Sequence, residues 1–204
     1  MIPRPLRPAA AALLTSWLAG ACSVVDLEAE PLAIHDLRTT LPASEGTPVP
    51  LALAVAEPAA LQPLASERIA TRSEEGALGV LSGARWAASG TRMVQEQLLR
   101  AFEGDGRLRA VSRAGEGIER DCVLASDLRA FEYEQATGRV RTALQARLVC
   151  GPERRLVASR AFAAEAGVTG SGAPAVVAAF EGASADLVAA VVRWALDVAP
   201  APDP

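Results

Sequence analysis

The sequence predicts an α+β fold: a mainly antiparallel β-sheet with two amphipathic helices packed on one face. Three long strand-like segments, 121–134, 139–150 and 154–163, follow one another across short turns, which is typical of an antiparallel meander. Two other segments repeat apolar residues at helical spacing, one before the meander and one after it. Because the strands are grouped and do not alternate with helices, the pattern favours α+β over a parallel α/β architecture.

Shorter strands are predicted at 35–38, 49–55, 68–72, 78–81 and 108–112. The clearest of them is 49–55, in which every second residue is apolar, as expected for a strand with one buried face. The polar segment 73–76 separates two of these strands and predicts a hairpin turn between them.

The first helix is predicted at 91–103, where Val94, Leu98 and Phe102 recur every four residues. The stretch Ser89-Gly90-Thr91 can cap its start, and Gly104 is expected to end it.

The second helix is predicted to start at Pro174, since proline lacks only an N–H that has no helical partner at that position. Its apolar stripe consists of Phe180, Leu187, Val191, Trp194 and Val198, and Pro200 closes it. We expect Trp86 and Trp194 to fill the core between helices and sheet.

Residues 1–21 have the composition of a signal peptide. Arg4 and Arg7 precede an apolar run that ends in small residues. At about a dozen residues, the run is too short to span ~30 Å of hydrocarbon. No other apolar run in the sequence is expected to reach transmembrane length.

Cys22 follows Leu18-Ala19-Gly20-Ala21, which resembles a bacterial lipobox with the favoured leucine one place further out than usual. That resemblance implies that Cys22 becomes the first mature residue and carries several acyl chains such as palmitate, enough for stable anchoring. Ser23 in the next position implies export to the outer membrane of a Gram-negative bacterium, on its periplasmic face. The alternative is an ordinary signal peptide that is cut after Ala21, with Cys22 incidental.

The expected organisation after the signal peptide is a tether at 22–32, one domain at 33–199 and a tail at 200–204. Without the signal peptide, 18 arginines face 24 acidic residues, and the net charge is about −6. This charge does not favour binding to nucleic acid or to anionic headgroups.

Cys122 and Cys150 lie near opposite ends of one predicted hairpin, and their midpoint, Ala136, falls in the predicted turn. The two cysteines therefore oppose each other and lie on the same face. Because export leads to an oxidising compartment, we expect a disulfide; two buried free thiols are the alternative.

The sequence offers little for catalysis. The single histidine, His35, is too few for most zinc sites and most His-activated nucleophiles, and no cofactor or metal is expected. The carboxylates Glu132, Glu134 and Glu165 are the candidates for a hydrolase, but they are more typical of solvated strand ends.

An ordered set of short motifs carries a family resemblance, which covers roughly residues 33 to 197. The set comprises 49–55, Arg68-Ile69, Arg85-Trp86, Asp121-Cys122-Val123-Leu124, 128–132, 142–149, Arg160-Ala161-Phe162 and Val192-Arg193-Trp194. This order, together with the lipobox, resembles the ABC-type transport auxiliary lipoprotein component family.

The resemblance implies a non-catalytic lipoprotein that assists an MCE-domain transport system in moving lipids between the inner and outer membranes. Its partners would be an MCE-domain protein and an ABC transporter permease and ATPase. A ring-shaped MCE assembly would favour a symmetric ring of copies of this chain. The alternative function is a structural or assembly lipoprotein of the cell envelope.

Overall fold

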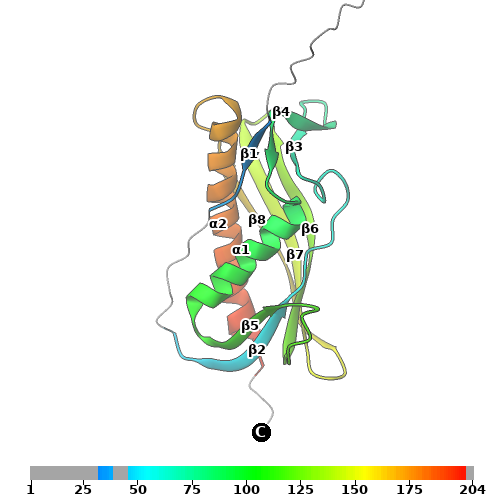
Figure 1. The fold of residues 1–204 in the computed structure, drawn as a ribbon, viewed down its shortest axis with the longest axis vertical. Coiled ribbons are helices and arrows are strands. Elements are labelled where there is room, and N and C mark those ends of the chain that lie inside the picture. Colours follow the sequence, from blue (N-terminus) through cyan, green and yellow to red (C-terminus); the bar gives the residue numbers. More distant parts are fainter. Residues whose placement is uncertain (1–31, 39–45, 201–204) are drawn as a thin grey trace, which may run out of the picture. The chain divides into compact units, whose positions relative to one another are not determined.

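The chain of the computed structural model runs through four strands, a helix, four more strands and a second helix (Figure 1). The structure describes residues 32–38 and 46–200, which belong to the unit Pro31–Pro204. Cys22 and the signal peptide lie outside the described residues. The elements are β1 (Ala33–His35), β2 (Val49–Val55), β3 (Arg68–Arg72), β4 (Leu78–Trp86), α1 (Gly90–Asp105), β5 (Leu108–Arg113), β6 (Cys122–Glu134), β7 (Arg139–Cys150), β8 (Arg155–Gly167) and α2 (Gly172–Val198). This order confirms the α+β prediction.

Strand β6 lies at the centre of the sheet. Along one edge it pairs antiparallel with β7 over its whole length. Along the other edge it pairs parallel with β2, through Leu53 and Cys122, and with β3, through Ala70 and Glu132. Between these two pairings, Ala59 forms a bridge with Asp127. Residues 49–72 therefore follow β6 as two strands in line.

The remaining strands extend the sheet from β6 in three directions. β8 pairs antiparallel with β7, β5 pairs parallel with β2, and β4 pairs antiparallel with β3 and parallel with β1. The predicted meander β6–β7–β8 and the hairpin β3–β4 are thus confirmed. Four of the seven pairings among the described strands are parallel, so the sheet is mixed, although its two longest pairings are antiparallel.

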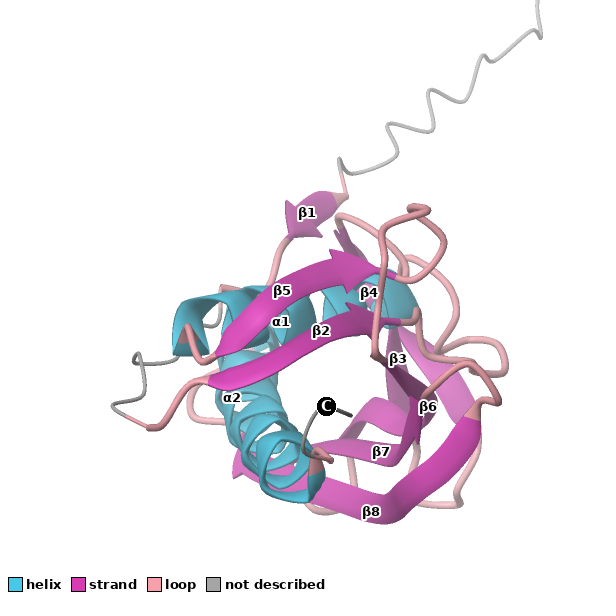
Figure 2. Ribbon diagram, turned by 90° about the horizontal axis from the view of Figure 1, so that it is seen from below, coloured by secondary structure: helices cyan, strands magenta, loops and turns pink. Residues whose placement is uncertain are grey.

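Both helices pack against the buried side of the sheet, which curves around them (Figure 2). α2 contacts β7 and β8, whereas α1 lies at an angle to α2 and contacts β2 and β5 (Figure 1). The Ser89 hydroxyl caps α1 by accepting a hydrogen bond from the Arg92 N–H. The prediction that Gly104 ends this helix was wrong: α1 continues to Asp105, and Gly106 supplies the left-handed residue (φ 75°) that terminates it.

Other boundaries also differ from the predictions. β4 continues to Trp86, beyond the predicted 78–81, and β8 continues to Gly167, beyond the predicted 163. α2 begins at Gly172, two residues before Pro174. The first strand is Ala33–His35 and not 35–38, because it forms where the chain runs beside β4. That partner lies about 50 residues away in the sequence, so local alternation does not reveal it.

Aromatic side chains join the helices to the sheet. Trp86 on β4 and Phe131 on β6 pack against Phe180 on α2, with ring centroids 4.8–5.7 Å apart. Trp194 contacts Phe162 in a second, T-shaped pair at 5.5 Å. Trp86 and Trp194 are buried, as predicted.

The close approach of α1 to the core leads to a stability prediction. A Cβ atom on Gly90 would lie 2.6 Å from the Leu64 carbonyl oxygen and 3.1 Å from a Phe131 ring carbon. We expect Gly90→Ala to lower the free energy of unfolding by about 1–3 kcal/mol in urea denaturation, because the neighbouring backbone must move.

Gly104→Ala is the matched control in the same helix, since a Cβ there meets nothing within 4 Å. Its expected effect is a gain of about 0.5–1 kcal/mol from helix propensity. Equal effects of the two substitutions would contradict the packing argument.

Candidate functional site

In the structure, a disulfide joins Cys122 at the start of β6 to Cys150 at the end of β7. The two residues are register partners, and their Cα atoms are 4.0 Å apart. The pairing of the whole hairpin places them opposite each other, as the position of Ala136 in the turn predicted. Both cysteines are buried, so the disulfide lies beneath the surface at this end of the sheet.

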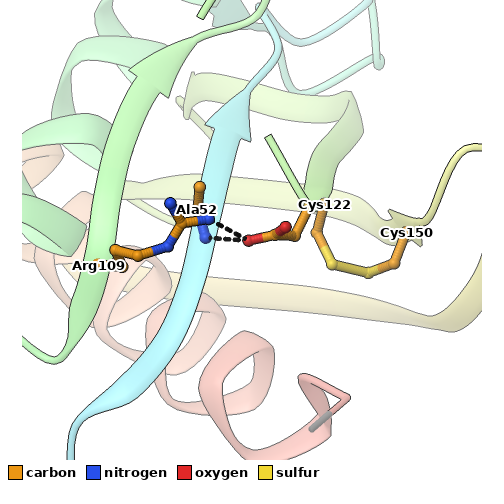
Figure 3. Close-up of a disulfide and its surroundings, with 5 residues drawn as sticks. Ala52, Arg109, Cys122 and Cys150 are labelled. Atoms are coloured by element: carbon orange, nitrogen blue, oxygen red, sulfur yellow. Dashed lines mark hydrogen bonds and ion pairs between the residues drawn. A yellow bond between two sulfur atoms is a disulfide. The ribbon is translucent and has the colours of Figure 1, made fainter. Parts of the chain in front are cut away.

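Asp121, which precedes Cys122, connects three segments, and Figure 3 shows two of its partners, Ala52 and Arg109, near the disulfide. Its carboxylate accepts hydrogen bonds from the Ala52 N–H at 2.6 Å and from the Arg109 guanidinium at 3.0 Å. Its backbone donates to the Ala52 carbonyl, and its own carbonyl accepts from the Gly151 N–H. The bond from Ala52, helped by Arg109, lowers the pKa of the Asp121 carboxyl against the opposing effect of burial. Sequence reasoning missed this residue because its partners are far away in the sequence.

A groove of about 1160 Å³ opens at this end of the molecule. Its walls are the start of β2, the segment 117–123, the segment 149–155 and Pro200 after α2. Apolar side chains and the disulfide line its interior, with Leu51, Val123, Val149 and Val157 among them. The walls of the groove therefore include both apolar side chains of the strands and residues of two loops.

The entrance to the groove carries charges of both signs. Arg120, Arg154 and Arg155 are exposed, and so are Glu119 and Glu153. None of these five forms an ion pair within the described part of the chain. An apolar centre with a charged rim that includes arginine is the usual anatomy of a protein-binding surface.

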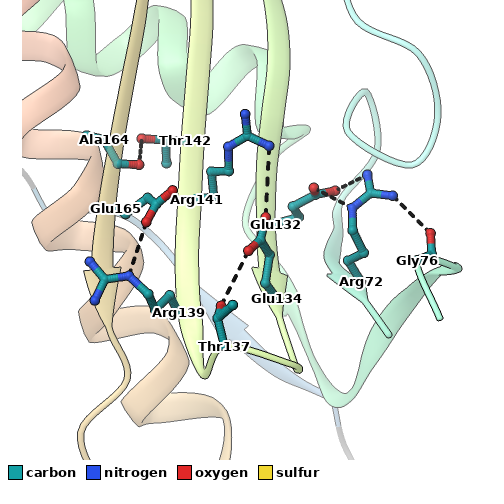
Figure 4. Close-up of polar contacts among 10 residues, drawn as sticks. All are labelled: Arg72, Gly76, Glu132, Glu134, Thr137, Arg139, Arg141, Thr142, Ala164 and Glu165. Carbon is teal, nitrogen blue, oxygen red and sulfur yellow. Dashed lines mark hydrogen bonds and ion pairs between the residues drawn. The ribbon is translucent and has the colours of Figure 1, made fainter. Parts of the chain in front are cut away.

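The carboxylates nominated for catalysis lie at the other end of β6, and each has an arginine partner there (Figure 4). The expectation that Glu132 is solvated was wrong: it is 2% exposed and accepts two hydrogen bonds from the Arg72 guanidinium, at 2.7 and 2.9 Å, because β3 lies beside the end of β6. Glu134 is 3.9 Å from Arg141, and Glu165 on β8 is 3.1 Å from Arg139. Each of these pairs joins two neighbouring strands.

The described residues contain no candidate metal site. No group of three or more His, Cys, Asp and Glu side chains converges among residues 32–38 and 46–200. His35 lies on β1, as an early-strand residue should.

By length and composition alone, α2 could cross a membrane. The expectation that no apolar run after the signal peptide reaches transmembrane length was therefore wrong. More than half of its most apolar stretch is buried against the rest of the protein. The apolar character of α2 is therefore accounted for by the core that it forms.

The disulfide leads to a second prediction. Replacing both Cys122 and Cys150 with serine should lower the free energy of unfolding by about 3 kcal/mol, because a closed loop of this length restricts the unfolded chain. Urea denaturation of the variant and of the parent measures the difference. Alkylation of both cysteines in the unreduced, unfolded parent, detected by mass spectrometry, would contradict the disulfide.

Asp121 leads to a prediction on pH dependence. Its pKa is lower in the folded chain than in the unfolded chain, so its contribution to stability is complete above about pH 4 and is lost as the pH falls through the folded pKa. Asp121→Asn should therefore flatten the decline in stability below pH 4. Because the carboxyl is half-exposed, we expect a difference of no more than about 1 kcal/mol.

Urea denaturation between pH 3 and pH 7 tests this expectation. Glu119→Gln in the same loop is the control, since that side chain is exposed and has no ion-pair partner among the described residues. Parallel stability curves for Asp121→Asn and the parent would contradict the role given to Asp121.

Solved structures with the same fold support the architecture. A crystal structure of a Xanthomonas campestris protein, described as DUF330, is 34% identical, covers 81% of this chain and 95% of its own, and has a TM-score of 0.76. An uncharacterized protein of 16% identity has a TM-score of 0.66, with 81% and 99% covered. A hypothetical protein from Chlamydia trachomatis, 8% identical, has a TM-score of 0.53, with 74% and 98% covered. The last two similarities concern the fold alone.

Comparison with curated proteins gives no match. Residues 35–192, most of the described structure, match the family described as ABC-type transport auxiliary lipoprotein component. The chain therefore belongs to the ABC-type transport auxiliary lipoprotein component family.

Proposed function

We propose that this protein is a non-catalytic lipoprotein of the outer membrane that assists an MCE-type ABC transport system for lipids. Membership of the transport auxiliary lipoprotein family carries this proposal. In it, residues 1–21 are removed as a signal peptide, Cys22 carries the acyl chains, and residues 22–32 tether the domain. The family description supports an association with an ABC transport system, and the MCE partner and the outer membrane are the finer part of the proposal.

A docking role agrees with the chemistry of the described residues. The three nominated carboxylates are each engaged by an arginine on a neighbouring strand, and they leave no free acid–base pair between them. A lipoprotein of this kind would act by binding a partner protein and holding it in place, and a sheet with a groove at one end can provide such a binding surface.

The groove beside the disulfide is the surface that we assign to the MCE-domain partner. It lies at the start of β6, whereas β1, which follows the tether, pairs with β4, and β4 pairs with β3, the strand beside the end of β6. Ten residues of β6 separate Cys122 from Glu132, about 33 Å along an extended strand. In this proposal, an anchor joined to β1 would therefore connect to the domain at the end opposite to the groove.

Co-purification tests this function. The tagged, lipidated protein would be isolated from detergent-solubilised envelopes of a Gram-negative host that expresses an MCE-type ABC transport system. We expect an MCE-domain protein to be recovered with it. Substituting Ile118→Glu in the groove should reduce that recovery about tenfold, because a charge would enter an apolar contact.

Leu61→Glu is the matched control, because Leu61 is also exposed and apolar but does not line the groove. Cys22→Ser is the control for the anchor and should release the protein into the periplasm. Recovery of other envelope proteins, with no MCE or transporter subunit, would support a structural or assembly role instead.

A further inference from the structure

The outer face of the sheet carries an exposed apolar patch at the end where β1 begins. It consists of Leu32 and Ile34, which are 55% and 59% exposed, and of Leu78 and Val80 on β4, which are 49% and 39% exposed. Single exposed apolar residues are normal on any protein surface, but a contiguous group indicates contact with another apolar surface.

Strand register places the β4 residues on the outer face. Ala70 pairs with both Val80 and Glu132, so these side chains point to the same side of the sheet. Phe131, the residue before Glu132, points into the aromatic core. Val80 therefore points outward, and so does Leu78, two residues earlier on the strand.

Strand register also places Ile34 on the outer face. Ile34 pairs with Arg85, which in turn pairs with Arg68. Trp86, the residue after Arg85, points into the aromatic core, so Arg85 and its partner Ile34 point outward, and Leu32 precedes Ile34 by two residues. β1 and β4 are direct neighbours and run parallel, so the four side chains lie on the same face of two adjacent strands.

The composition of the patch differs from that of the outer face further along the sheet. On β7 and β8 the outward positions at this end hold the ion pair Arg139–Glu165 and the side chain of Arg141 (Figure 4). A strand with one solvated face normally carries polar residues on it. Leu32, Ile34, Leu78 and Val80 depart from this pattern, and Arg85, the partner of Ile34, is the charged residue beside them.

We propose that this patch rests on the membrane surface to which Cys22 anchors the protein. Leu32 follows Cys22 by ten residues, which can extend at most about 35 Å. The chain thus enters the domain at the patch itself, and a lipid surface is the apolar surface that the anchor holds nearest to it. This inference rests on the proposed lipid anchor and adds an orientation to it, with the patch facing the lipid and the groove facing away.

The experiment uses the full lipidated protein in vesicles of phosphatidylethanolamine and phosphatidylglycerol. An environment-sensitive dye would be attached through Leu78→Cys, with the native pair Cys122–Cys150 left as a disulfide. We expect lipids with a nitroxide near the headgroup to quench this dye about twofold, because the patch would lie at the boundary of headgroups and acyl chains. The matched control is the same dye on Ile118→Cys, at a site of similar exposure (51%) in the groove, where no quenching is expected.

Flotation of the vesicles separates failure of the anchor from failure of the orientation. Protein that floats with the vesicles while the dye at position 78 stays unquenched would overturn the orientation and leave the anchor intact. Protein that does not float would overturn the anchor, and this inference with it. In detergent, a shift in the emission of the dye at position 78 that grows with protein concentration would assign the patch to contact with a second copy of the chain. This result would also overturn the inference.

Discussion

The two-sided pairing of β6 is the constraint on which the rest of the structure depends. One edge of this strand is occupied by β7 along its full length, and the other edge is divided between β2 and β3. Through β2 it holds β5, and through β3 it holds β4 and β1. The side chain of Phe131 on the same strand reaches the aromatic cluster with α2. Loss of register in β6 would therefore disturb every layer of the fold, because a slip of one residue exchanges its two faces.

The length of β6 also separates the two surfaces to which functions are assigned. Its first residue, Cys122, forms the disulfide beneath the groove, and Asp121 just before it binds β2 and β5. Its last residues pair with β3, where Glu132 is held by Arg72, and the apolar patch lies one strand further on. A stiff strand between the two ends suits a protein whose proposed task is to hold a partner at a set distance from a membrane.

Sequence reasoning succeeded where the interactions are local. The hairpin of β6 and β7 has a turn that is visible in the sequence, and the midpoint of Cys122 and Cys150 in that turn correctly places the two residues opposite each other. The repeat of Val94, Leu98 and Phe102 likewise predicted α1, although its end lay at Gly106 and not Gly104. The parallel pairings of β6 with β2 and β3 join residues about 60 or more positions apart. No local pattern encodes such pairings, so neither Asp121 nor the groove was predicted.

The sequence by itself determined the kinds of elements, their order, the opposed cysteines, the resemblance to a lipoprotein family and the aromatic core residues, because periodicity, turn residues and composition are properties of neighbouring positions. The tertiary structure alone decided which strands are neighbours, which carboxylates meet arginines, and which end of the sheet holds the groove and which the patch. These outcomes depend on pairing between distant segments and on which face of each strand is buried. Leu78 and Val80 illustrate the difference: they fit a buried strand position equally well in the sequence, and only the register with β3 places them outside.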